Sequence, residues 1–104
     1  SLEKALVRDK RQPNLVLLPA AQSRNKEAIT PEQMKEIVDQ LSKAHDYVLI
    51  DSPAGIEMGF RNAIAAAEEA IIVTTPEMAA VRDADRVVGL LENEAIKKIH
   101  LIVN

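Results

Sequence analysis

The chain has 104 residues, a formal net charge of -3, no cysteine, and one tyrosine and one phenylalanine as its only aromatic residues. This length suits one small domain with a core of its own, while the acidic balance argues against a broad nucleic-acid surface and the scarcity of aromatics against base stacking. The lack of cysteine excludes disulfides, thiolate metal sites and thiol nucleophiles, and because no apolar run reaches membrane-spanning length, the chain as given is expected to be soluble and intracellular.

The first predicted elements are short. Residues 2–8 are expected to be the tail of a helix, and the apolar run LVLL predicts a strand over 14–18. A polar loop with Arg24 and Lys26 follows over 19–29. This loop is the longest stretch of the sequence without a periodic pattern.

A helix is predicted over 31–44, where apolar residues recur at helical spacing. These residues are Met34, Ile37, Val38 and Leu41. Thr30 and Gln33 have the spacing of a capping box, and Pro31 stands at the first helical position. Residue types and spacing therefore agree on where this helix begins.

Strands and helices alternate over the rest of the chain. The apolar runs YVLI, AIIV and IHLIV predict strands over 47–51, 70–74 and 99–103, and continuous runs of this kind are typical of parallel strands buried on both faces. Helices are predicted between them, over 60–67 and 76–93. The expected fold class is α/β, a three-layer and mainly parallel sheet with right-handed crossovers.

The predicted sheet is not closed by a further helix after its last strand. Four strands in this arrangement leave apolar surface uncovered. We therefore expect residues 1–104 to form a single partial α/β domain that is part of a larger one.

The predicted binding residues follow the strands, because ligands of open α/β sheets bind at the carboxyl ends of the strands. Asp51 follows four apolar residues, the pattern of a strand whose carboxylate holds Mg²⁺, usually through water. The alternative is a strand-end aspartate that caps the next turn. Pro53 and Gly55 predict a turn; the Gly55 N–H could face a terminal phosphate and switch between two backbone states, or the turn could be an ordinary one.

Two further strand ends carry polar residues. In TTPE, residues 74–77, Thr75 is expected to be the N-cap of a helix that Pro76 begins. Asn104 follows the last strand, where its amide could meet a purine edge or serve as a turn residue.

The helix over 76–93 carries VRDADR, in which charges of both signs alternate. Asp83 and Asp85 lie about 200° apart around a helix, so at most one of them faces a given partner surface. The alternative is a solvated face on which Arg82 pairs with Asp85 and Asp83 with Arg86. Val81 is expected on the apolar stripe of this helix.

Four segments in this order and spacing, DSPAGIE, EAIIVTTPE, AAVRDADRVVGLL and LIVN, resemble the ParA/MinD family of deviant-Walker ATPases, and NLVLLPAAQSR upstream fits the same family. The resemblance covers essentially the whole chain. It implies a P-loop NTPase-like fold and Mg²⁺-dependent ATP hydrolysis by a nucleotide-switched homodimer. The family's Gly-rich Walker A loop and its strand are absent, so the parent protein is expected to be an ATPase and the isolated chain to be inactive.

The resemblance also assigns roles to residues. Asp51 matches the Walker B carboxylate, the switch II segment includes Gly55, and both would be catalytic. The residues that would bind ATP are Asp51, Ser52, Pro53, Gly55 and Asn104, with Asp51 holding Mg²⁺ through water. Glu77, Asp83 and Asp85 lie in the region that serves the dimer and its partners.

The implied biology is the choice of the septum site in cell division. The ATP-bound dimer would bind the membrane through a C-terminal helix outside this chain and recruit the division inhibitor MinC, and MinE would stimulate hydrolysis. The resemblance implies no nucleic-acid partner. The expected location is the cytoplasm and the inner membrane face, or alternatively the plastid stroma.

Two other classes of function remain open. A phospho-receiver domain also ends a central strand in an aspartate, as Asp51 would, and places a hydroxyl such as Thr74 after the next strand. It needs an acidic pair after its first strand, however, and LVLLPAA offers none. The third class is a non-catalytic interaction fragment.

Overall fold

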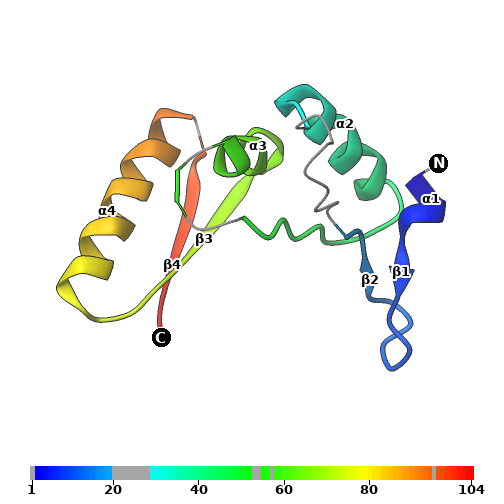
Figure 1. Cartoon of the computed structure of the whole chain (residues 1–104), viewed down its shortest axis with the longest axis horizontal. Helices are drawn as coiled ribbons and strands as arrows, with labels where there is room; N and C mark the ends of the chain where they lie inside the picture. The colour runs from blue at the N-terminus through cyan, green and yellow to red at the C-terminus, as the bar shows by residue number, and fades with distance from the viewer. Residues whose placement is uncertain (1, 20–28, 53–54, 57, 95) are drawn as a thin grey trace.

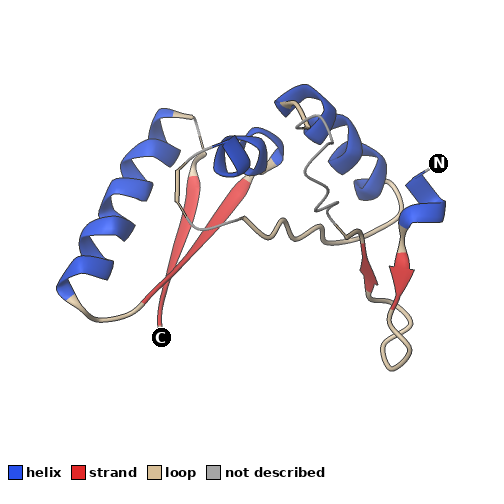
Figure 2. Cartoon of the chain, in the orientation of Figure 1, coloured by secondary structure: helices blue, strands red, loops and turns tan. Residues whose placement is uncertain are grey.

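The computed structural model describes residues 2–19, 29–52, 55–56, 58–94 and 96–104. Helices and strands alternate along the chain (Figures 1 and 2). The elements are α1 Leu2–Ala5, β1 Val7–Arg8, β2 Val16–Leu17, α2 Pro31–Ser42, α3 Met58–Ala66, β3 Glu69–Thr74, α4 Met78–Asn93 and β4 Lys98–Val103. The predicted α/β class is confirmed, and the three predicted helices are present.

The longest sheet is the parallel pair of β3 and β4. Its register runs from Glu69 opposite Lys98 to Thr74 opposite Val103. The connection between the two strands contains α4, which packs on β3. The predicted strands over 70–74 and 99–103, and their parallel pairing, are therefore confirmed.

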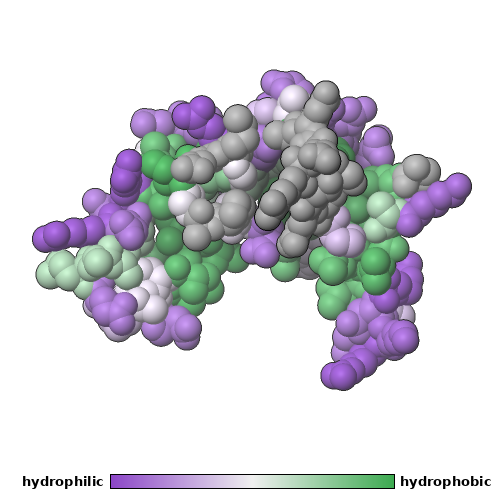
Figure 3. Space-filling model, in the orientation of Figure 1, coloured by the Kyte–Doolittle hydropathy of each residue, from purple (hydrophilic) through white to green (hydrophobic). Residues whose placement is uncertain are grey.

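Helices cover one face of this sheet. Along β3 the covered side chains include Ala70 and Ile72, whereas Ile71 and Val73 remain 58% and 65% exposed. The buried cluster beneath α4 consists of Phe60, Leu91 and Ile96. The sequence predicted strands buried on both faces, but in the described part of the chain the second face is open, and hydrophobic residues show on the surface there (Figure 3).

The helix α2 begins as the sequence predicted. The Thr30 hydroxyl accepts a hydrogen bond from the Gln33 N–H at 3.1 Å, and the Gln33 side chain accepts one from the Thr30 N–H at 2.9 Å. Pro31 occupies the first helical position, where its missing N–H costs nothing. The helix then packs against α3.

The first part of the chain differs from the prediction. Residues 2–8 were expected to be helical, but α1 ends at Ala5 and β1 follows. The predicted strand over 14–18 is reduced to β2, which pairs antiparallel with β1 rather than parallel in a larger sheet. The cause is a turn in which the Asp9 carboxylate accepts hydrogen bonds from the backbone N–H groups of Arg11 and Gln12, so that the chain reverses direction.

The predicted strand over 47–51 is wrong. These residues run extended from the end of α2 toward the turn before α3 without joining either sheet (Figure 1). Tyr47 and Leu49 are 88% and 87% exposed, and Val48 and Ile50 between them are half-buried. A strand needs a hydrogen-bonding neighbour, and the described residues provide none for this segment.

The molecule is more open than a complete domain of its mass. Its accessible surface is 8981 Å², whereas a folded monomer of this mass exposes about 5,800 Å². The radius of gyration is 15.1 Å, against about 13 Å for a compact chain of this length. Much of the excess is apolar surface of the two sheets and of the segment over 47–50.

Candidate functional site

The segment from Asp51 to Ile56 connects the extended residues to α3. Asp51 and Ser52 are exposed, and Pro53 lies outside the described residues. Gly55 has a φ of +96°, a backbone conformation that other residues rarely adopt. Ile56 packs against the buried cluster, so the end of the turn is anchored to the core while Asp51 stays open to solvent.

This geometry is compatible with a Mg²⁺–phosphate group. Mg²⁺ in nucleotide sites is held by one or two carboxylates together with waters and substrate phosphates. Asp51 is such a carboxylate; within the described ranges no group of three or more acidic, histidine or cysteine side chains could hold a metal. No heavy atom lies within 4 Å of where a Cβ on Gly55 would stand, so the backbone there is open to an approaching ligand.

The carboxyl ends of β3 and β4 form a second group. The Asn104 N–H donates to the Thr74 carbonyl at 2.8 Å, which places these two residues side by side. Thr74 is buried and its hydroxyl donates to the Thr75 carbonyl at 3.3 Å. The side chain of Asn104 is exposed, and in the described part of the chain no hydrogen bond or ion pair joins this group to Asp51.

The start of α4 differs from the prediction. Its N-cap is Glu77, and not Thr75. The Thr75 hydroxyl donates instead to the Glu77 carboxylate, which makes no side-chain capping bond itself. The negative charge held there is favourable, because the N-terminus of a helix carries partial positive charge.

Asp83 and Asp85 are both exposed, and Ala84 between them is buried. They therefore flank the buried stripe of α4, in agreement with their angular separation. The ion pairs suggested with Arg82 and Arg86 do not form: among described residues, the ion pairs are those of Glu69.

The apolar stripe of α4 is shorter than predicted. Val81 was expected to face the core but is 47% exposed, and Met78, which the sequence did not single out, is 69% exposed. Ala84 and Leu91 are buried as expected. The first turn of the helix has no apolar partner in the described structure, so its apolar side chains remain at the surface.

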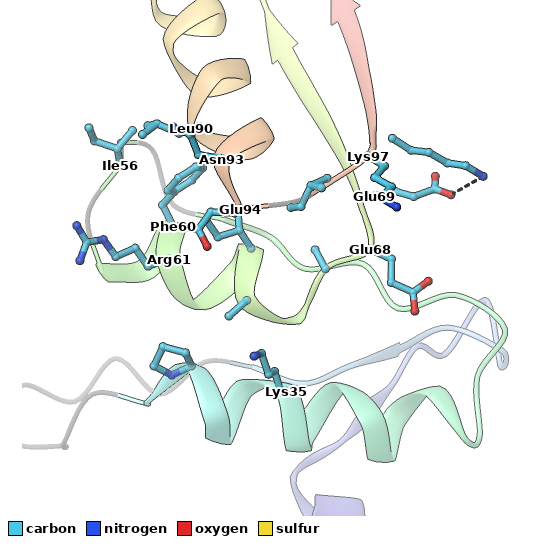
Figure 4. A pocket seen from close by; sticks show the side chains of 16 residues that line it. Lys35, Ile56, Phe60, Arg61, Glu68, Glu69, Leu90, Asn93, Glu94 and Lys97 are labelled. Atoms are coloured by element: carbon cyan, nitrogen blue, oxygen red, sulfur yellow. Dashed lines mark ion pairs between the residues drawn. The ribbon is translucent and has the colours of Figure 1, made fainter.

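The sequence also gave no indication of a pocket of about 1080 Å³ between α2, α3, the first residues of β3 and β4, and the end of α4 (Figure 4). Its apolar lining includes Phe60, Ile64, Leu90 and Ile96. Charges of both signs surround it, including the pair of Glu69 and Lys98 at 3.6 Å. The predicted site residues do not line it, and β3 and β4 begin here, whereas Thr74 and Asn104 lie at their other ends.

The helices in the described ranges are all too short or too polar to cross a bilayer.

Comparison with known proteins gives a consistent result. The family model for an AAA domain matches residues 4–101. The septum site-determining protein MinD of Synechocystis sp. is 70% identical over 104 residues, which are 100% of this chain and 39% of that protein. A putative MinD of Guillardia theta is 69% identical over 103 residues, 99% of this chain and 38% of that protein. The chain thus spans well under half the length of these relatives.

The solved structures agree with the sequence relatives. The MinC:MinD cell division protein complex of Aquifex aeolicus contains a chain that matches with a TM-score of 0.86 and 46% identity. The match covers 99% of the present chain and 41% of that one.

Proposed function

The chain belongs to the AAA domain family and is similar over its whole length to MinD cell-division proteins, and from that premise we propose that it is the part of a MinD-like ATPase that holds Mg²⁺ and responds to the terminal phosphate of ATP. Asp51 holds the metal through water, and the turn at Gly55 offers its backbone N–H to the phosphate. When bound, Mg²⁺ and ATP supply the hydrolytic chemistry.

The observation that carries this proposal is the union of Asp51 and Gly55 in one short turn. The carboxylate is exposed and precedes a glycine whose φ is +96°. A fixed carboxylate beside a backbone donor places one group on the metal and one on the phosphate, which is the pairing that nucleotide sites use. The phosphate cradle itself is not in this sequence, which has only 3 glycines and no Gly-rich run.

The wider role follows from the family. We infer that residues 1–104 are part of a larger P-loop ATPase domain, and the open apolar face of β3 and β4 supports this. The complete protein would form an ATP-bound homodimer on the membrane, recruit MinC, respond to MinE and help to position the division site. Glu77, Asp83 and Asp85, all exposed on or beside α4, are candidates for the dimer and partner interface. The proposed location is the cytoplasm and the inner membrane face, or the plastid stroma.

The receiver alternative has less support. It requires Asp51 at the end of a sheet strand and a free hydroxyl near Thr74. The segment before Asp51 is not paired in a sheet, and the Thr74 hydroxyl is buried and bonded to the backbone.

The test is Mg²⁺-dependent ATP binding by the full-length protein. Asp51→Asn keeps the shape of the side chain and removes its charge. We expect binding or hydrolysis to fall by about 10²-fold or more, the scale on which a preorganised electrostatic group acts. Asp46→Asn, which changes another exposed carboxylate on the same segment, serves as the control and should leave ATP binding unchanged. Equal activity of the two variants would refute the assignment of Asp51.

A further inference from the structure

A hydrogen bond joins two parts of the chain that are far apart in sequence. The side-chain N–H of Asn62, in α3, donates to the backbone carbonyl of Ile29 at 2.6 Å. Ile29 directly precedes Thr30, the N-cap of α2. The bond therefore fixes the point at which the chain enters α2 relative to α3.

The other half of the Asn62 amide is unusual. Its Oδ1 is buried and has no hydrogen-bond partner among the described residues. Buried polar atoms are nearly always paired, because an unpaired one is costly. A conformation in which Oδ1 gains a donor would therefore be favoured over this one, so the Asn62 contact has the property needed of an element with two states.

Asn62 also lies close to the proposed phosphate-binding turn. The helix α3 begins at Met58, three residues after Gly55, and Asn62 is about one helical turn further on. Ile56 and Phe60 pack in the same core cluster, on either side of the helix start. Because a short packed helix moves as a unit, a displacement of the turn at Gly55 reaches Asn62 directly.

We propose that Asn62 is a positioning residue that couples the turn at Gly55 to the segment 29–34 at the start of α2. The inference rests on the proposed function, since it takes that turn to respond to ATP. Binding of Mg²⁺–ATP changes the position of α3, the Asn62–Ile29 hydrogen bond transmits the change, and the first turn of α2 becomes more or less protected. The nucleotide state is thereby carried to a surface that does not contact the nucleotide.

Amide hydrogen exchange of the full-length protein tests this coupling. Exchange over 29–34 is measured with and without Mg²⁺–ATP for the unmodified protein, Asn62→Ala and Asn62→Asp. Arg61→Ala, an exposed side chain on the same helix, is the matched control. The Asp substitution keeps the size of the side chain and removes the donor, so it answers the question even if the Ala variant folds poorly.

The expected results separate coupling from simple stability. In the unmodified protein and in Arg61→Ala, Mg²⁺–ATP changes exchange over 29–34 several-fold. In both Asn62 variants exchange without nucleotide rises about 5- to 10-fold, the factor for one lost hydrogen bond, and the response to ATP disappears while ATP still binds. A residue that only stabilised the fold would not remove the response.

Two outcomes would overturn the inference alone. One is an unchanged response to ATP in the Asn62 variants, and the other is an unmodified protein that binds Mg²⁺–ATP with no change over 29–34. An unmodified protein that does not bind Mg²⁺–ATP at all would overturn the proposed function, and the inference with it.

Discussion

Substitution of Gly55 by alanine should weaken ATP binding through the backbone alone. The φ of +96° is open to glycine and strained for alanine, and such strain costs about 1–3 kcal/mol. No atom lies within 4 Å of the added Cβ, so steric contact adds nothing to this cost. At 1.4 kcal/mol for each factor of ten, the population of the turn conformation falls by about 5- to 150-fold.

Most of this cost should appear in binding and little in stability. The turn is exposed, so Gly55→Ala can relax to another local conformation while Ile56 and the core remain in place. Isothermal titration of the full-length protein with Mg²⁺–ATP measures the first effect, and thermal unfolding measures the second. Gly55→Asn should recover part of the affinity, because asparagine tolerates positive φ better than alanine.

Gly89→Ala is the matched control with the opposite sign. Gly89 lies inside α4, is exposed and also has no atom within 4 Å of an added Cβ. Alanine there should stabilise the helix by about 0.5–1 kcal/mol and leave ATP binding unchanged. If Gly55→Ala matched the unmodified protein in both affinity and stability, the positive φ would have no role in binding.

Three further outcomes are expected. Leu91→Ala should lower the free energy of unfolding by about 2–5 kcal/mol, measured by urea, because Leu91 is 2% exposed in the core cluster and the change leaves a cavity; a loss under 1 kcal/mol would contradict this. Thr30→Ala should cost about 1 kcal/mol in the same assay by removing the cap of α2, whereas Ser42→Ala at the other end of the helix should cost much less. Residues 1–104 alone should release no phosphate from Mg²⁺–ATP, and turnover that Asp51→Ala abolished would show otherwise.

Features fixed by local interactions could be predicted from the sequence. The start of α2 depends on Thr30, Pro31 and Gln33, which are close in sequence and make the expected hydrogen bonds. The parallel pairing of β3 and β4 follows from the helix between them, because parallel strands need a long connection. Asp51 and Gly55 were selected for the same reason, since their spacing is local.

Features that depend on distant partners could not be predicted. The apolar run over 47–50 indicates a segment that prefers to be buried, but its pairing depends on a neighbour that the run does not encode. Val81 has the spacing of the core stripe and lies where nothing covers it. The contact of Asn62 with Ile29 spans 33 residues and has no pattern that sequence reasoning could detect.

The continuity of β3, α4 and β4 along the chain determines the order in which the protein can fold. The sheet pairing and the contact between α4 and β3 both lie within residues 69–103, so this unit can nucleate without closing a long loop. It should form during synthesis as soon as β4 leaves the ribosome, and its amides should be the last to exchange. Tyr47 and Leu49, which project from an unpaired backbone, would then be the segment that chaperones and proteases encounter first.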